Sequence, residues 1–167
     1  MKTTTSYLFC AALAVACSTA LAQAPATFDM RSLTPEAALR AAQATLRHCA
    51  QNGYQVAVAV VDRTGTPLVM LRDRLAGFHT PETATGKAFT ALSFKLDTLA
   101  VGQATQADQV LSGLRHLPRV VAVGGGRLIE AGGTLVGAIG VSGAPGGEAD
   151  DACAREGIAA IQEDLDF

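Results

Sequence analysis

The sequence has little excess charge of either sign and few aromatic side chains. Its 167 residues carry 13 basic and 15 acidic side chains, which leaves a formal net charge of −2. So small an imbalance provides no electrostatic footprint for nucleic acid and no basis for cationic binding to a membrane surface. The length suits one domain, and a hydrophobic content of 49% argues against a disordered chain.

Several motifs of common enzymes are also absent. Gly124–Gly126 is not followed by the last glycine of the pattern GxGxxG, and Gly86-Lys87 is not followed by the serine or threonine of a P-loop. The stretch Gly140–Ala144 differs from a nucleophile elbow because alanine stands where the final glycine is needed. No two of the three histidines have the spacing of zinc ligands. These absences argue against nucleotide-binding, serine-hydrolase and zinc sites.

The first 22 residues have the pattern of a signal peptide. Lys2 precedes an uncharged run, in which the apolar stretch Leu8–Cys17 is too short to span a bilayer about 30 Å thick. Ala20-Leu21-Ala22 then matches a signal-peptidase site and predicts cleavage before Gln23. We therefore expect a periplasmic or secreted protein without a membrane span.

Cleavage at this site would change the cysteine inventory from four to two. Cys10 and Cys17 would leave with the leader, and Cys49 and Cys153 would remain. A lipid anchor on Cys17 is disfavoured because no leucine stands three residues before it. In an oxidising compartment the remaining pair forms either a disulfide or two buried free thiols, and both alternatives stay open. A bridge closing a loop of about 100 residues would raise the free energy of unfolding by up to about 4.7 kcal/mol.

The order of predicted elements indicates one α+β domain over residues 34–167, preceded by an N-terminal extension over 23–33. Thr34-Pro35-Glu36 and Thr80-Pro81-Glu82 each combine a capping hydroxyl, a proline and an acid, as helix starts do. Blocks of helices and strands favour a mostly antiparallel sheet, here of five strands, with helices packed on its faces. The predicted elements are a helix over 34–53, strands 55–62 and 67–72, a helix over 80–95, one or two short helices within 97–114, strands 119–123, 127–130 and 134–141, and a helix over 148–163.

His79 has the most chemically useful neighbours of the three histidines. Three of the six phenylalanines lie within sixteen residues of it, in a sequence that is only 5% aromatic: Phe78, Phe89 and Phe94. Three cationic side chains lie within nine residues: Arg72, Arg74 and Lys87. An axial ligand, flat apolar contacts and cations for propionates are what an iron porphyrin needs. A helix-capping histidine above an ordinary core fits the same residues equally well.

A series of short motifs runs through the chain in a familiar order. The segments that carry it are Val58–Gly65, Leu71–Asp73, Lys87–Phe94, Gly124–Gly126, Gly137–Pro145 and the acidic helix Glu148–Gly157. In these segments the sequence resembles the GlcG/HbpS-like haem-binding family, which also occurs as the C-terminal domain of some corrinoid adenosyltransferases. The resemblance implies a five-stranded antiparallel sheet with helices on its faces, assembled as a homo-oligomer, often an octamer.

The resemblance also implies further site residues. Thr98 matches by position a threonine implicated in haem contact in a secreted relative, and His116 lies in the stretch Arg115–Pro118 of the branch that this sequence resembles most. The haem-binding N-terminal histidine of another branch has no counterpart, because the first histidine here is His48.

Three functional hypotheses follow. The leading one is an exported protein that binds haem or a related tetrapyrrole, with His79 as the axial iron ligand and four further contacts: Thr98, His116, Arg74 and Lys87. The second is an enzyme or binder for a small organic acid, in which Arg72, Arg74 and Lys87 bind the carboxylate and Asp62 or His79 is the acid or base. The third is a structural homo-oligomer without a ligand.

Overall fold

A four-stranded antiparallel sheet forms the centre of the protein. The structure is a computed structural model that describes residues 24–166, so the predicted signal peptide and its cleavage site lie outside the described residues. The strands are β1 (Ala57–Asp62), β2 (Pro67–Arg72), β3 (Gly126–Ala131) and β4 (Thr134–Ser142). Their order across the sheet is β2-β1-β4-β3, so β1 and β4 are central and both pair antiparallel with their neighbours.

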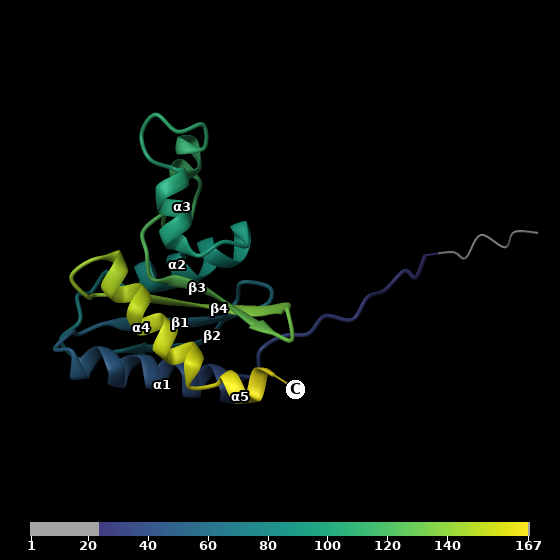
Figure 1. The fold of residues 1–167 in the computed structure, drawn as a ribbon, viewed down its shortest axis with the longest axis horizontal. Helices are drawn as coiled ribbons and strands as arrows, with labels where there is room; N and C mark the ends of the chain where they lie inside the picture. Colours follow the sequence, from purple (N-terminus) through teal and green to yellow (C-terminus); the bar gives the residue numbers. More distant parts are fainter. Residues whose placement is uncertain (1–23, 167) are drawn as a thin grey trace, which may run out of the picture.

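Helices cover both faces of this sheet and make three layers (Figure 1). On one face lie α1 (Pro35–Gln51) and α4 (Gly147–Ala159), followed by the short α5 (Gln162–Leu165). On the other face lies α2 (Thr80–Phe94), and α3 (Thr98–Ala104) leads from it into an arm that projects away from the sheet (Figure 1). The 3-10 helix η1 (Ser112–His116) belongs to this arm. No helix within residues 24–166 is both long and apolar enough to cross a membrane.

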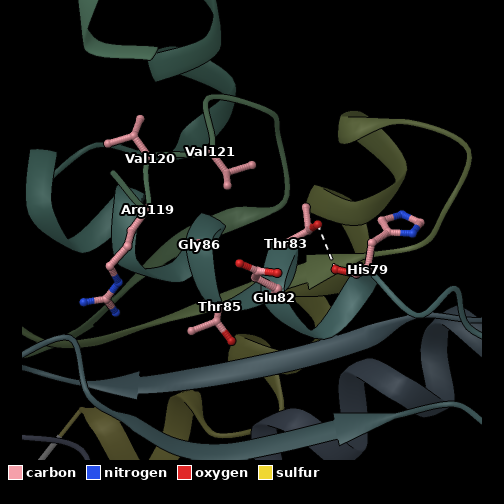
Figure 2. A pocket seen from close by; sticks show the side chains of 8 residues that line it. All are labelled: His79, Glu82, Thr83, Thr85, Gly86, Arg119, Val120 and Val121. Atoms are coloured by element: carbon pink, nitrogen blue, oxygen red, sulfur yellow. Dashed lines mark hydrogen bonds between the residues drawn. The ribbon is translucent and has the colours of Figure 1, made fainter. Parts of the chain in front are cut away.

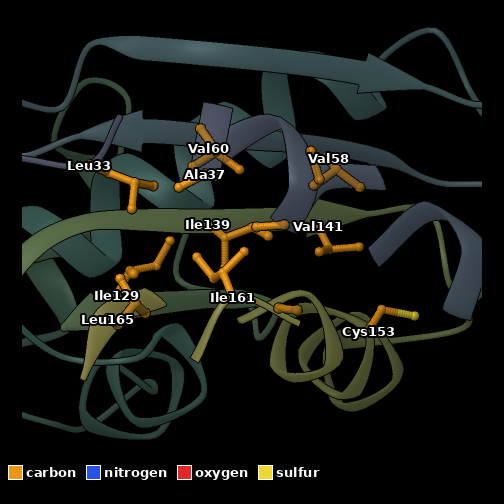
Figure 3. Close-up of a cluster of buried hydrophobic side chains, with 14 of the residues drawn as sticks. Leu33, Ala37, Val58, Val60, Ile129, Ile139, Val141, Cys153, Ile161 and Leu165 are labelled. Carbon is orange, nitrogen blue, oxygen red and sulfur yellow. The ribbon is translucent and has the colours of Figure 1, made fainter. Parts of the chain in front are cut away.

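The two faces of the sheet carry side chains of different size. Because successive residues of a strand point to opposite faces, Val58 and Val60 of β1 face the main core with α1 and α4 (Figure 3), whereas Ala57 and Ala59 face α2. On the α2 side the sheet also presents Gly140, where a Cβ would overlap the backbone oxygen of Ala84. Small residues therefore allow the backbone of α2 to lie unusually close to the sheet.

A disulfide joins the two helices on the opposite face. Cys49 in the last turns of α1 bonds to Cys153 in the middle of α4, and both residues are buried in the main core. The bond closes a loop with a sequence separation of 104 residues. Of the two alternatives left open by the sequence, the structure contains the bridge.

The predicted strand over Arg119–Val123 is wrong, and the sheet has four strands instead of five. This segment packs against α2 as an irregular connection, where the Val121 N–H donates to the Thr90 hydroxyl over 2.8 Å. Arg119 has a left-handed backbone (φ 69°), which strand geometry does not allow. The apolar run in this segment resembles a buried strand, but its partner is a helix.

Most other predicted elements are confirmed to within a few residues. The region 97–114 holds one α-helix and the start of the 3-10 helix, as expected. The last predicted helix, over 148–163, is interrupted at Ala160 and Ile161 and appears as α4 and α5. The Thr34 hydroxyl caps α1 by accepting a hydrogen bond from the Ala37 N–H.

Candidate functional site

The loop over residues 73–79 places His79 at the N-terminus of α2. The Arg72 guanidinium donates two hydrogen bonds to the Ala76 carbonyl oxygen, and the Asp73 carboxylate accepts from the Leu75 N–H at 2.8 Å. Next to them, the Thr80 hydroxyl and its N–H both donate to the Gly77 carbonyl. These bonds hold the loop in one conformation and present the histidine at its end.

His79 is the N-cap residue of α2, but its side chain does not cap the helix. Its carbonyl oxygen accepts hydrogen bonds from the N–H and the hydroxyl of Thr83, as Figure 2 shows for the hydroxyl. Among the residues that the structure describes, no hydrogen-bond partner exists for either ring nitrogen, and the residue is exposed. The helix-capping role that the sequence left open therefore belongs to the backbone, and the imidazole is available for a ligand.

Two adjoining pockets meet at His79 and Thr83, and we call them together the His79 groove. The first has a volume of about 400 Å³ and lies between α2 and the connection Arg119–Val121 (Figure 2). Its other lining residues on α2 are Glu82, Thr85 and Gly86. A Cβ at Gly86 would come within 2.5 Å of a Val121 methyl carbon, so glycine is needed for this connection to lie against the helix.

The second pocket has a volume of about 340 Å³ and is lined by a buried ion pair. Lys87 of α2 is only 2% exposed, and its Nζ lies 2.6 Å from Oδ2 of Asp150 in α4. The other carboxylate oxygen of Asp150 accepts the Ala144 N–H at 2.9 Å and so holds the glycine-rich turn before α4. Burial raises the pKa of Asp150, and the nearby Lys87 ammonium opposes this rise.

The predicted contact residues are only partly brought together. His79 and Lys87 line the same pocket, although the charge of Lys87 is already balanced by Asp150. Arg74 and His116 are exposed and line neither pocket of the His79 groove. Thr98 is fully buried, and its hydroxyl is bonded to the backbone N–H and carbonyl of Gly126.

The three phenylalanines near His79 in the sequence do not form one cluster around it. Phe89 and Phe94 follow it by ten and fifteen residues along α2, which corresponds to about 15 and 22 Å of helix length. Phe78 is 95% exposed beside His79, under the Arg72 guanidinium at 5.4 Å from the ring centre. The sequence therefore predicted more aromatic surface around the imidazole than the structure has, because residues that are close in sequence along a helix can lie far apart.

The groups required by the organic-acid hypothesis are mostly engaged elsewhere. Arg72 holds the loop before His79, and Lys87 is paired with Asp150. Asp62 organises the turn between β1 and β2 by accepting from Thr64 and from the Thr66 N–H. Partial burial raises the pKa of Asp62, but these hydrogen bonds outweigh it and hold the pKa below its usual value. Asp62 does not line the His79 groove.

Two residues of the groove were missed by sequence reasoning. Arg119 was placed inside a strand, and no local pattern marks its left-handed backbone. Asp150 is one acid among several at the start of α4, and its partner Lys87 lies 63 residues earlier. Within residues 24–166, no group of three or more histidine, cysteine, aspartate or glutamate side chains could hold a metal ion.

Comparison with known proteins identifies the family. Residues 33–159 match the family described as "Haem degrading protein HbpS-like", and the chain belongs to this family. A double mutant of HbpS from Streptomyces reticuli has 37% sequence identity and a TM-score of 0.76, covering 81% of this chain and 90% of that one. The predicted resemblance is thus confirmed.

Two further relatives carry names that refer to ligands. The structure of a PduOC:haem complex has 33% identity and a TM-score of 0.74, covering 78% of this chain and 95% of that one. The corrinoid adenosyltransferase PduO of Salmonella typhimurium is 36% identical over 135 residues, which are 80% of this chain. The matched part is 38% of the length of PduO, so the chain corresponds to one portion of that enzyme.

Proposed function

We propose that this protein binds haem or a related tetrapyrrole in the His79 groove, with His79 as the axial ligand of the iron. The observation that carries the proposal is the exposed imidazole at the junction of two pockets, with no hydrogen-bond partner among the described residues. Membership of the HbpS-like family and similarity to a protein solved with haem support the same ligand class.

The residues of the groove fit such a ligand. An imidazole nitrogen is a common axial ligand of haem iron, and the bound iron would supply redox chemistry that no side chain here offers. Within the groove, the half-buried side chains of Val120 and Val121 provide apolar surface for a flat macrocycle. The buried Thr98 is not in a position to touch a ligand unless α3 moves.

Titration of the purified protein with haemin tests this function. We expect a shift of the Soret band that saturates with one site, and we expect His79→Ala to abolish the shift or to move its wavelength. The matched control is His48→Ala, because His48 lies on α1 beside Asn52, on the opposite face of the sheet. A wild-type protein without a Soret shift, or an unchanged spectrum in His79→Ala, would contradict the proposal.

We also propose that the protein is exported. The support is the signal-peptide pattern of residues 1–22, together with a disulfide between the two cysteines that would remain after cleavage. Protein expressed from the full sequence should begin at Gln23. Intact mass and N-terminal sequencing measure this directly, and an uncleaved protein in the cytoplasm would contradict it.

Self-association is the third part of the proposal. Large apolar side chains are exposed on the arm and beside His79, including Val110 (99% exposed), Phe78 (95%) and Leu75 (75%). Surfaces of this kind are typical of protein interfaces. Light scattering should show a homo-oligomer, and Val110→Asp should reduce its size. A monomeric wild-type protein would contradict this expectation.

A further inference from the structure

Ser142, the last residue of β4, is only 5% exposed and lines the second pocket of the His79 groove. Successive residues of a strand alternate between the faces of the sheet, so Ser142 lies on the same face as Ala138 and Gly140, which pack on α2. Among the described residues, no group forms a hydrogen bond with the Ser142 hydroxyl. A hydroxyl at a pocket wall that the protein leaves unpaired is a hydrogen-bond donor for a ligand.

The Lys87 ammonium group in the same pocket has more donors than the protein uses. An ammonium group carries three N–H donors, and Oδ2 of Asp150 accepts one of them at 2.6 Å. No second acceptor for this group exists in the part of the chain that the structure describes. Because the side chain is almost completely buried, its other two donors are left for a ligand or for water in the pocket.

The first turn of α4 adds backbone N–H donors to this pocket. Its N-cap residue is Gly146, and no side chain caps the helix there. The first hydrogen bond within the helix runs from the Asp150 N–H to the Gly146 carbonyl, so the N–H groups of residues 147–149 have no acceptor within the helix. Gly146 and Gly147 both line the pocket, which therefore lies at the positive end of the helix dipole.

The balance of charge at the pocket favours a ligand with a single negative charge. Lys87 and Asp150 neutralise each other, and both oxygens of Asp150 already accept hydrogen bonds, from Lys87 and from the Ala144 N–H. What remains is the positive end of α4, equivalent to about half an elementary charge, which the carboxylate of Glu148 beside Gly146 reduces further. A carboxylate fits these donors better than a phosphate dianion, whose second charge would have no counterpart.

We propose that the second pocket binds a small monocarboxylate, whose oxygens accept hydrogen bonds from the Ser142 hydroxyl, the Lys87 ammonium and the first turn of α4. The pocket volume of about 340 Å³ suits a small organic acid. The site requires neither an iron nor a tetrapyrrole, so it does not rest on the proposed function above. It also differs from the organic-acid site expected from the sequence, because Arg72 and Arg74 take no part in it.

Calorimetric titration of the purified protein, before any haemin is added, tests this site. The probes are sodium butyrate, the neutral isostere butyramide and inorganic phosphate. They are titrated into wild-type protein, Ser142→Ala and the control Ser93→Ala, which removes an exposed hydroxyl of α2 outside the pocket. Neither substitution breaks a hydrogen bond of the described structure, so both variants should retain the wild-type unfolding temperature.

Wild-type protein should bind butyrate more tightly than butyramide or phosphate. Ser142→Ala should weaken butyrate binding about tenfold, the value of one hydrogen bond to a charged group, and Ser93→Ala should leave it unchanged. In nuclear magnetic resonance spectra, butyrate should shift the amide signals of Gly147 and Glu148.

Three results would each overturn the carboxylate site: no saturable binding of butyrate, equal binding by wild-type protein and Ser142→Ala, or tighter binding of phosphate or butyramide. The haemin titration is independent of these results. A protein that binds haemin but not butyrate contradicts the carboxylate site alone, and one that binds butyrate but not haemin contradicts the proposed function alone.

Discussion

At the scale of single residues, the buried ion pair beneath the His79 groove connects the fold to the site. Lys87 and Asp150 come from helices on opposite faces of the sheet, and Asp150 also holds the Ala144 N–H. Removing two charges from water is costly, and the pair compensates for this only while both partners are present. The pair therefore stabilises one arrangement of the pocket more than it stabilises the protein as a whole.

We predict that the substitutions Lys87→Met and Asp150→Asn are strongly non-additive. Each alone should lower the free energy of unfolding by about 3–5 kcal/mol, because it leaves one buried charge without a partner. The double variant should lose clearly less than the sum of the two single losses. Chemical denaturation of all four proteins measures the coupling.

The exposed pair Arg40–Asp164 serves as the control for this experiment. Its side chains are 50% and 56% exposed, so Arg40→Met should cost less than about 1 kcal/mol. Additive losses at Lys87 and Asp150 would show that the two charges do not depend on each other in the folded protein.

At the scale of secondary-structure elements, the close packing of α2 on the sheet determines where the groove lies. The helix contributes Ala84, Ala88 and Ala91 to this contact, and the sheet contributes Gly140. The sequence predicted the bounds of α2 closely, but not its cap. Thr80 lies in the first turn and its hydroxyl donates to the Gly77 carbonyl, whereas His79 is the N-cap residue. The segment Arg119–Val123 was predicted wrongly, because Val121 packs on α2 at Gly86 and no local feature distinguishes a helix partner from a neighbouring strand.

We predict that Gly140→Ala lowers the free energy of unfolding by about 3 kcal/mol, at the upper end of the range for an overpacked core. The added methyl group would overlap the backbone of Ala84, which cannot move without displacing α2 from the sheet. The matched control is Gly113→Ala in the arm, where a Cβ meets nothing within 4 Å. Urea denaturation of both variants measures the difference, and equal effects at the two positions would contradict the close packing.

At the scale of the whole molecule, the Cys49–Cys153 disulfide ties the first helix to the last long one. Its loop contains most of the described chain, including the complete sheet. A covalent link across so long a loop stabilises the folded state mainly by restricting the unfolded chain. The bond lies on the face of the sheet opposite α2, and neither cysteine lines the His79 groove. The disulfide therefore affects the groove only by stabilising the folded chain.

We predict that the free energy of unfolding of the variant Cys49→Ala/Cys153→Ala is about 2–5 kcal/mol lower than that of the wild type. A reductant should lower the unfolding temperature of the wild type and leave that of the double variant unchanged. Alkylation followed by mass spectrometry should modify both thiols only after reduction. Free thiols in the native, unreduced protein would contradict this prediction.

The sequence by itself determined the local features: the Thr34 cap of α1, the bounds of β1 and β2 to within two residues, and the loop histidine at the start of α2. These follow from interactions between residues a few positions apart, which a sequence records directly. Only the tertiary structure decided that the sheet has four strands, that Lys87 is paired with Asp150 and that Thr98 is buried. It alone brought Arg119 to the groove of His79, 40 residues away in the chain, because each of these outcomes depends on contacts between distant segments packed on α2 and the sheet.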